Sequence, residues 1–282
     1  MNDTHSPLFI QSLATGLDVL LAFNAERTSM NLPEIAEAAG ITKSAAQRFA
    51  FTLEVLRFLR KDPATKRYSL DPRTLKFAYG YLLSSPLIER ANPYLLELNR
   101  RSRETVNLTE PSGVKMVLIA RFPNPEHSIV HMPIGRRLPM FCTASGRAYL
   151  SALPEDEARA ILEASDRIKM TPTTVTDVGR LMATLAEARE HGFAYANQEY
   201  YRGDLNLAVP LLNVSGRPIA AMNLSAATSR WTMEKLRDEM VPMLIETARL
   251  ISTTPPTPSA LEPFQRGYGV EVSSPKRKAK TA

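Results

Sequence analysis

The chain has few of the residues that build covalent or metal-centred sites. Its 282 residues include one cysteine, Cys142, and four histidines. A lone cysteine excludes an internal disulfide framework and a zinc site made of several cysteines. His127 and His131 are four residues apart, but the prolines around them argue against a helix that would place both on one face. We therefore expect neither a metal site nor a bound cofactor.

Long apolar runs are also missing. No segment approaches the length of a membrane-spanning helix, and residues 1–10 lack the charged start and apolar stretch of a secretory signal. A hydrophobic content of 44% with 23% charged residues is typical of a globular protein. We therefore expect a cytoplasmic protein, not associated with a membrane and long enough for two domains.

The stretch that organises the chain begins at residue 32. Pro33 suits the first turn of a short helix, and Gly40 can adopt the left-handed conformation that ends it. Thr42 is placed to cap a second helix. The apolar residues of that helix recur at helical spacing and should face the core: Ala46, Phe49, Leu53 and Leu56. Two helices joined by such a tight turn predict a helix-turn-helix.

A small hairpin follows these helices, and positive charge concentrates around it. Residues 58–61 and 66–70 read as strands, and the proline of the Asp-Pro-Ala-Thr segment between them favours a type I turn. Residues 43–76 contain nine basic and three acidic residues, whereas residues 1–42 contain one arginine and five acidic residues. The alternative is a solvent-exposed amphipathic helix followed by a hairpin, with no role in binding. The local positive field instead favours a winged helix-turn-helix that binds double-stranded DNA.

Eight residues of this region are candidates for contacts with DNA. Recognition helices present their N-terminal residues to base edges in the major groove. Because glutamine pairs with adenine and arginine with guanine, Gln47 and Arg48 are the predicted base-reading residues. The predicted contacts to phosphates come from the same helix and from the hairpin: Lys43, Ser44, Arg60, Lys61, Lys66 and Arg67.

The second half of the chain predicts an α+β domain. Residues 105–110 and 114–122 read as strands separated by Pro-Ser-Gly, a third strand is expected at 128–132, and residues 133–146 should be irregular. Asn92-Pro93 predicts the start of a new helix. Further strands and helices are expected up to residue 252, with an antiparallel sheet covered by helices. The basic, proline-containing residues 253–282 should form a disordered tail.

The order and spacing of several segments resemble the IclR family of transcriptional regulators over residues 10–252. These segments include SLATGLDVLLAF, LPEIAEAAGITKSAAQRFAFTL, IGRRLPMFCTASGRAYLSALP and GFAYANQEYYRGDLNLAVPLLNVSGRPIAAMNLS. The resemblance implies a winged helix-turn-helix at 10–72, a linker helix at 73–84 and a GAF-like effector-binding domain at 85–252. It also implies a homodimer or homotetramer whose effector is a small metabolite, often a carboxylate.

The same resemblance implies a pocket between a loop and the sheet. The implied lining is Leu138, Met140, Thr143, Ala144, Ser145, Ala196, Leu207, Asn223 and Ser225. Backbone amides at a helix N-terminus suit a carboxylate. The alternative is that the loop serves only as a helix cap and that Asn223 and Ser225 are strand residues without a role in binding. Ala196 stands where glyoxylate-type members have an acid, and FCTASGRA and MNLS are closer to regulators of aromatic-acid and β-ketoadipate catabolism. We therefore expect a larger, aromatic carboxylate.

Cys142 leaves two other functions open. It could be a redox switch within a regulator, or a nucleophile with His127 or His131 as its base. Lone cysteines are commonly buried apolar residues, and the sequence has no Ser-His-Asp, paired-carboxylate or phosphate-loop pattern. We therefore expect a regulator and not an enzyme.

Overall fold

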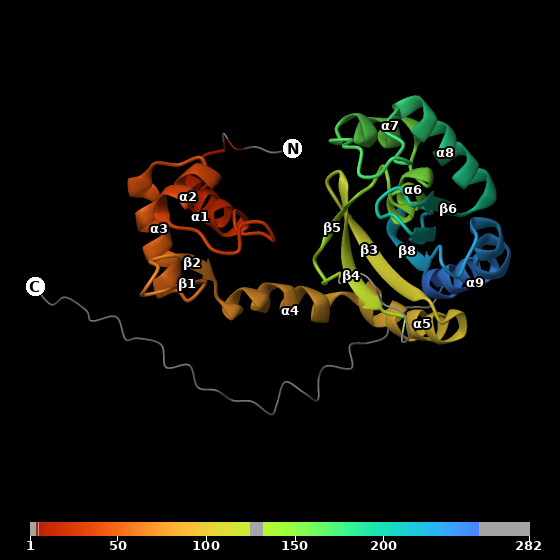
Figure 1. The fold of residues 1–282 in the computed structure, drawn as a ribbon, viewed down its shortest axis with the longest axis horizontal. Helices are drawn as coiled ribbons and strands as arrows, with labels where there is room; N and C mark the ends of the chain where they lie inside the picture. The colour runs from red at the N-terminus through yellow and green to blue at the C-terminus, as the bar shows by residue number, and fades with distance from the viewer. Residues whose placement is uncertain (1–3, 5, 125–131, 254–282) are drawn as a thin grey trace, which may run out of the picture. The chain divides into compact units, whose positions relative to one another are not determined.

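The computed structural model describes residues 4, 6–124 and 132–253. The chain divides into two compact units, residues Met1–Ser84 and Ser85–Ala282 (Figure 1). The first is mainly helical and the second is built on an antiparallel sheet, which confirms the predicted α+β class. Among the described residues, none of the helices combines the length and apolar character needed to cross a membrane.

The first unit contains the predicted winged helix-turn-helix. Its elements are α1 (Gln11–Leu21), α2 (Leu32–Ala38), α3 (Lys43–Val55), β1 (Leu59–Lys61) and β2 (Tyr68–Leu70). The two strands pair antiparallel with Leu59 opposite Leu70. One buried cluster joins all five elements and includes Val19, Ile35, Ala46, Leu53, Leu59 and Tyr68.

The ends of the helices follow from their capping residues. Asn31 accepts a hydrogen bond from the Glu34 amide while the Glu34 carboxylate accepts one from the Asn31 amide, which is a complete capping box. Gly40 has φ +64°, so the chain turns where a residue with a Cβ would be strained. The Thr42 hydroxyl accepts a hydrogen bond from the Ala45 amide at 3.2 Å, as the sequence predicts for the start of α3.

A one-turn 3-10 helix, η1 (Pro72–Thr74), and α4 (Leu75–Ser84) complete this unit. α4 covers most of the predicted linker helix. No residue of α4 is buried, and its side chains include exposed Phe77, Tyr79 and Tyr81. α4 therefore gains little from packing within its own unit.

The second unit is a six-stranded antiparallel sheet with helices on both faces (Figure 1). The strand order is β5-β4-β3-β8-β7-β6. The strands are β3 (Thr105–Ser112), β4 (Lys115–Phe122), β5 (Arg137–Pro139), β6 (Ala194–Asn197), β7 (Asp204–Leu212) and β8 (Pro218–Ala227). Helices α5 (Pro86–Ser102) and α9 (Met233–Thr253) pack on one face. The other face is covered by α6 (Ala144–Ser151), with α7 (Glu155–Glu163) and α8 (Val178–His191) packed around it.

Two local expectations were wrong. Asn92-Pro93 does not start a helix, because α5 begins at Pro86 under a Ser85 cap and runs through Pro93. Residues Leu87, Ile88 and Ala91 before this proline and Leu95 and Leu98 after it bury one continuous face, so packing outweighs the hydrogen bond that proline cannot make. Residues 133–146 are not wholly irregular, because β5 pairs with β4 within them.

Two further expectations concern residues that the structure does not describe. The strand expected at 128–132 and the tail expected at 253–282 lie outside the described residues, apart from Met132 and from Thr253, which closes α9.

Candidate functional site

The first turns of α3 present polar side chains to solvent. Ala46, Ala50 and Leu53 bury the opposite face of this helix against the core of the unit. Four residues on the open face are exposed, and their side chains make no hydrogen bond or ion pair within the described part of the chain: Lys43, Ser44, Gln47 and Arg48. These side chains are therefore available to a ligand of the unit.

The wing carries exposed cations beside this helix. Arg60 Nε donates to Ser69 Oγ at 3.0 Å, and Lys61 Nζ lies 5.2 Å from the centre of the Tyr68 ring. Lys66 has φ +58° at the turn between the strands, and it is exposed. Three of the four predicted wing contacts therefore keep a charged group at the surface.

Arg67 is placed differently from the other predicted DNA contacts. Its Nη2 donates to Glu34 Oε2 at 2.6 Å and to the Ser29 carbonyl at 2.7 Å, and its Nε donates to Ser29 Oγ at 2.9 Å. The hydrogen bonds from the Asn31 amide and from Arg67 lower the pKa of Glu34. The guanidinium thus ties β2 to the capping box of α2 and has few donors left for a phosphate.

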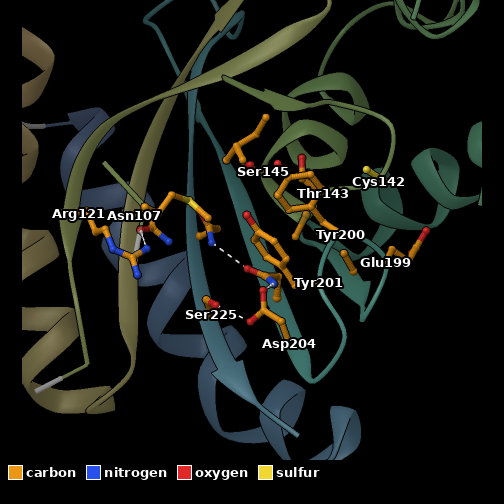
Figure 2. Close-up of a pocket in the computed structure, with 16 residues that line it drawn as sticks. Asn107, Arg121, Cys142, Thr143, Ser145, Glu199, Tyr200, Tyr201, Asp204 and Ser225 are labelled. Carbon is orange, nitrogen blue, oxygen red and sulfur yellow. Dashed lines mark hydrogen bonds between the residues drawn. The ribbon is translucent and has the colours of Figure 1, made fainter. Parts of the chain in front are cut away.

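The second unit contains a cavity of about 50 Å³ between α6 and the sheet (Figure 2). Its walls come from the loop before α6 and the first turn of that helix, from the loop between β6 and β7, and from all six strands of the sheet. The lining combines apolar and aromatic side chains with a large polar set: Met132, Leu138, Cys142, Tyr200 and Tyr201 beside Asn107, Arg121, Thr143, Ser145, Asp204, Asn206, Asn223 and Ser225.

One end of this cavity is the N-terminus of α6. Thr143 caps the helix, because its hydroxyl accepts a hydrogen bond from the Gly146 amide at 3.3 Å and donates to the Pro139 carbonyl at 2.6 Å. The amides of Ala144 and Ser145 donate no hydrogen bond within the described residues, as expected for the first residues of a helix. The Ser145 hydroxyl also lacks a partner there, although only 2% of this residue is exposed. This end of the cavity therefore offers three hydrogen-bond donors.

The loop before α6 is held in place by a buried ion pair. Arg147 Nη1 and Nη2 each donate to a carboxylate oxygen of Glu199 at 2.6 Å, and Arg147 Nε donates to the Phe141 carbonyl at 3.0 Å. Glu199 also accepts a hydrogen bond from the Val175 amide at 3.0 Å. Because the Arg147 and Glu199 side chains are only 2% and 7% exposed, this pair fixes the start of α6 against β6 and the following loop.

A row of polar side chains crosses the sheet beneath the cavity. Arg121 of β4 pairs in register with Asn107 of β3, which in turn pairs with Asn223 of β8. Arg121 Nη1 donates to Asn107 Oδ1 at 2.9 Å, and Asn223 Nδ2 donates to Asn206 Oδ1 of β7 at 3.1 Å. Amides at the centre of a buried sheet are costly unless they are satisfied, so this row is a feature that packing alone does not explain.

Asp204 ends this row at the start of β7. Its two oxygens accept hydrogen bonds from Ser225 Oγ at 2.6 Å and Asn206 Nδ2 at 2.7 Å. Burial raises the pKa of the Asp204 carboxyl, and these hydrogen bonds and the positive charge of Arg121 oppose the rise. Figure 2 shows Asp204 and Ser225 together, with Tyr201 between them and Ser145 in that view.

The two tyrosines of the β6–β7 loop form a wall that Arg136 supports. The Tyr200 and Tyr201 ring centres are 4.5 Å apart in an edge-to-face arrangement. Arg136 Nη2 donates to the Tyr201 hydroxyl at 2.6 Å and to the Tyr200 hydroxyl at 3.3 Å. These aromatic faces give the cavity a surface on which a flat ligand can stack.

Cys142 lines the cavity but has the chemistry of a core residue. It is fully buried, and burial raises the pKa of its thiol to about 12. The nucleophile is the thiolate, so burial disfavours the reactive form of this thiol at neutral pH. The described lining favours binding and includes no activated nucleophile. His127 and His131, the bases considered for Cys142, lie outside the described residues.

Seven of the nine pocket residues implied by the resemblance line this cavity, and Met140 and Leu207 do not. Leu207 follows Asn206 on β7, and successive strand residues face opposite sides of the sheet, so its side chain points away from the cavity. Met140 is buried with its backbone against Gly146.

Several lining residues were missed by sequence reasoning. They are Asn107, Arg121, Met132, Cys142, Glu199, Tyr200, Tyr201, Asp204 and Asn206. One signal was available: Asp204 and Asn206 are polar residues at alternate positions of an otherwise apolar strand.

Comparison with known proteins identifies both units. Residues 79–253 match the family model of the bacterial transcriptional regulator IclR C-terminal domain, and residues 12–63 match the IclR helix-turn-helix domain. The chain is 33% identical over 247 residues to the Pca regulon regulatory protein of Pseudomonas putida, which covers 87% of this chain and 84% of that protein. It is 31% identical over 245 residues to the p-hydroxybenzoate hydroxylase transcriptional activator of Acinetobacter baylyi, which covers 85% of this chain and 90% of that protein.

A solved structure also matches the chain over both units. An IclR homolog from Microbacterium hydrocarbonoxydans, crystallised in complex with 4-hydroxybenzoate, superposes with a TM-score of 0.70 at 26% identity and covers 86% of this chain and 98% of that one. The chain therefore belongs to the IclR family of transcriptional regulators and is a DNA-binding regulator, not an enzyme.

Proposed function

We propose that this regulator binds an aromatic carboxylate in the cavity of its second unit and that this ligand changes its affinity for an operator. The observation that carries the proposal is the N-terminus of α6: Ala144 and Ser145 line the cavity, and their amides and the buried Ser145 hydroxyl have no hydrogen-bond partner among the described residues. Amide groups and the helix dipole at this position favour a negative charge.

The rest of the lining supports an aromatic ligand. Tyr200, Tyr201, Met132 and Leu138 provide the flat and apolar surface on which a ring packs. The solved homolog in complex with 4-hydroxybenzoate supports the same ligand class, and one relative is named as the transcriptional activator of p-hydroxybenzoate hydroxylase.

Entry of the ligand requires a side chain to move. The cavity encloses about 50 Å³, whereas a protein cavity that accommodates benzene is roughly 150 Å³. The Tyr201 side chain lies between the two ends of the cavity in the view of Figure 2, and Arg136 holds its hydroxyl. Displacing Tyr201 would break that hydrogen bond, which gives the ligand a means to alter the loop between β6 and β7.

The DNA contacts are proposed from the exposed side chains of the first unit. Gln47 and Arg48 read bases, and Lys43, Ser44, Arg60, Lys61 and Lys66 contact phosphates. Arg67 instead stabilises the wing through its ion pair with Glu34 and its hydrogen bonds to Ser29. Removing Gln47 should relax the base preference at one operator position, whereas removing Lys66 should weaken binding to all sequences alike.

We also propose that a second copy of the chain covers the apolar face of α1. Leu13, Leu17 and Leu21 repeat every four residues along this helix, and they are 59%, 48% and 77% exposed. Helix-turn-helix proteins commonly read two half-sites as dimers, and a homodimer or homotetramer would bury these leucines.

The ligand is tested by isothermal titration of the full-length protein with benzoate, with acetate as the non-aromatic probe. We expect benzoate to bind, acetate to bind more weakly, and Ser145→Ala to weaken benzoate roughly tenfold through the loss of one hydrogen bond to a charged group. Ser151→Ala is the matched control, because Ser151 is buried in the same helix, does not line the cavity, and its hydroxyl donates to the Ala148 carbonyl. Absence of benzoate binding, or equal losses in the two variants, would contradict the proposal.

A further inference from the structure

The proposed carboxylate site uses one end of the cavity and leaves the polar row on the sheet without a role. Asn107 and Asn223 in this row are only 4% and 7% exposed. Internal contacts do not satisfy all of their groups. Asn107 accepts from Arg121, but its amide nitrogen donates to nothing within the described residues, and no described group donates to Asn223 Oδ1. Both residues line the cavity, so these groups are open to a ligand.

The charges beside this row nearly cancel. Asp204 is negative and Arg121 is positive, and both line the cavity. The other acid of the lining, Glu199, is already bound by both Nη atoms of Arg147. A second carboxylate on the ligand would therefore lose its hydration without a net opposite charge to compensate, whereas a neutral group faces no such penalty.

Asp204 is arranged to accept a hydrogen bond. Ser225 and Asn206 each donate to one of its oxygens and fix the orientation of the carboxylate. An ionised carboxylate has about four acceptor positions, so positions remain for a ligand that donates. A hydroxyl group can donate to Asp204 and can accept from a neighbouring amide or guanidinium at the same time.

We propose that Asp204 accepts a hydrogen bond from a ring hydroxyl of the ligand, which makes the pocket selective for hydroxylated aromatic monocarboxylates. This inference rests on the proposed function, because the carboxylate at α6 sets the ring between the two ends of the cavity. Asp204 is then the residue that decides which aromatic acids the regulator detects.

The test compares five probes on the full-length protein by isothermal titration. We expect 3-hydroxybenzoate or 4-hydroxybenzoate to bind roughly ten- to a hundredfold more tightly than benzoate, as the gain of one hydrogen bond to a charged acceptor predicts. Terephthalate, which has a second carboxylate, should bind more weakly than benzoate. 4-Methoxybenzoate cannot donate a hydrogen bond through its ring substituent, so it should bind no more tightly than benzoate. This comparison uses the wild-type protein alone.

Two variants assign the preference to Asp204. Asp204→Asn keeps the shape of the side chain but lowers its acceptor strength, so the ratio of hydroxybenzoate affinity to benzoate affinity should fall at least about fivefold. Asp238→Asn is the control, because Asp238 is exposed on α9 and does not line the cavity. An unchanged preference in Asp204→Asn would overturn the inference.

The outcomes separate this inference from the proposed function. If benzoate binds and depends on Ser145, but neither hydroxybenzoate binds more tightly, only the role of Asp204 is wrong. If no aromatic acid binds at all, the proposed function fails and the inference falls with it.

Discussion

At the scale of single residues, the environment of a side chain decides its role more than its type does. Lys66 and Arg67 are neighbouring cations on the wing. Lys66 extends into solvent at a turn, whereas Arg67 is bound to Glu34 and Ser29. The sequence alone suggests the same DNA contact for both, because it does not reveal that the capping acid of α2 lies beside β2.

Exchanging these two residues for alanine should therefore have different effects. Lys66→Ala should weaken binding to every duplex and reduce the slope of log affinity against log salt by about one, without changing stability. Arg67→Ala should lower the melting temperature of the first unit and leave the salt slope of the folded protein unchanged. Equal changes of the salt slope would contradict the supporting role of Arg67.

The Arg67 effect should depend on pH in a defined direction. The hydrogen bonds from Asn31 and Arg67 lower the pKa of Glu34 below its ordinary value of 4.5. A carboxylate with a lowered pKa contributes stability above the pKa of the unfolded chain, and this contribution is lost as the pH falls through the folded value. The difference in melting temperature between the wild type and Arg67→Ala should therefore be full at pH 7 and should shrink below about pH 4.

Cys142 provides a second prediction at this scale. Because burial raises its pKa from 9.0 to about 12, the thiolate fraction of the folded protein at pH 7 is lower by a factor of about a thousand. Iodoacetamide should modify the native protein at least that much more slowly than the protein unfolded in urea. Comparable rates in the two states would mean that the thiol is accessible and would revive a redox role.

At the scale of elements, the start of α6 is the most constrained part of the second unit. A Cβ on Gly146 would lie 2.2 Å from Met140 Cα and 2.3 Å from the Met140 carbonyl oxygen. Backbone cannot give way as a flexible side chain can. The close approach of α6 to the loop before it therefore requires glycine at this position.

Gly146→Ala should destabilise the second unit by at least about 3 kcal/mol, since it overpacks backbone against backbone. The control is Gly80→Ala in α4, where a Cβ meets nothing within 4 Å and should stabilise the helix by up to about 1 kcal/mol. Urea unfolding followed by circular dichroism measures both. A tolerated Gly146→Ala would show that α6 is not packed as described.

The elements show which parts of the fold the sequence predicts. Caps and turns such as Thr42 and Gly40 depend on neighbouring residues, so the helix-turn-helix could be read directly. The position of Pro93 inside a helix could not be predicted, because a helix tolerates this proline only through its packing against residues far away in the sequence. Likewise, which residues of β7 face the cavity depends on the register of the strand. The prediction of Leu207 as a lining residue was off by one position, because Asn206 lines the cavity and its neighbour faces the opposite side of the sheet.

At the scale of the whole molecule, the chain combines a basic DNA-binding unit with a unit that contains a polar cavity. The cluster around Arg121 and Asp204 depends on residues from four strands far apart in the sequence, so no local pattern predicts it. Coupling between the two units requires that ligand binding and DNA binding each favour one state of the protein over another.

The proposed association of two copies through α1 is tested by sedimentation equilibrium. Leu17→Glu should shift the protein toward a monomer and weaken operator binding, because a charge would be buried at the interface of the dimer. Gln11→Glu adds the same charge to the same helix at an exposed position away from the leucine stripe and should change neither property. If Leu17→Glu assembles as the wild type does, α1 is not the interface.

The most direct test of the central claim is a pair of titrations on the full-length protein, using an operator selected from a random duplex library. Operator affinity is measured with and without saturating 4-hydroxybenzoate, and 4-hydroxybenzoate affinity is measured with and without operator. The account predicts that both affinities change by the same factor, roughly 5- to 150-fold, as linkage between two sites requires. An operator affinity that does not change when the cavity is saturated would contradict it.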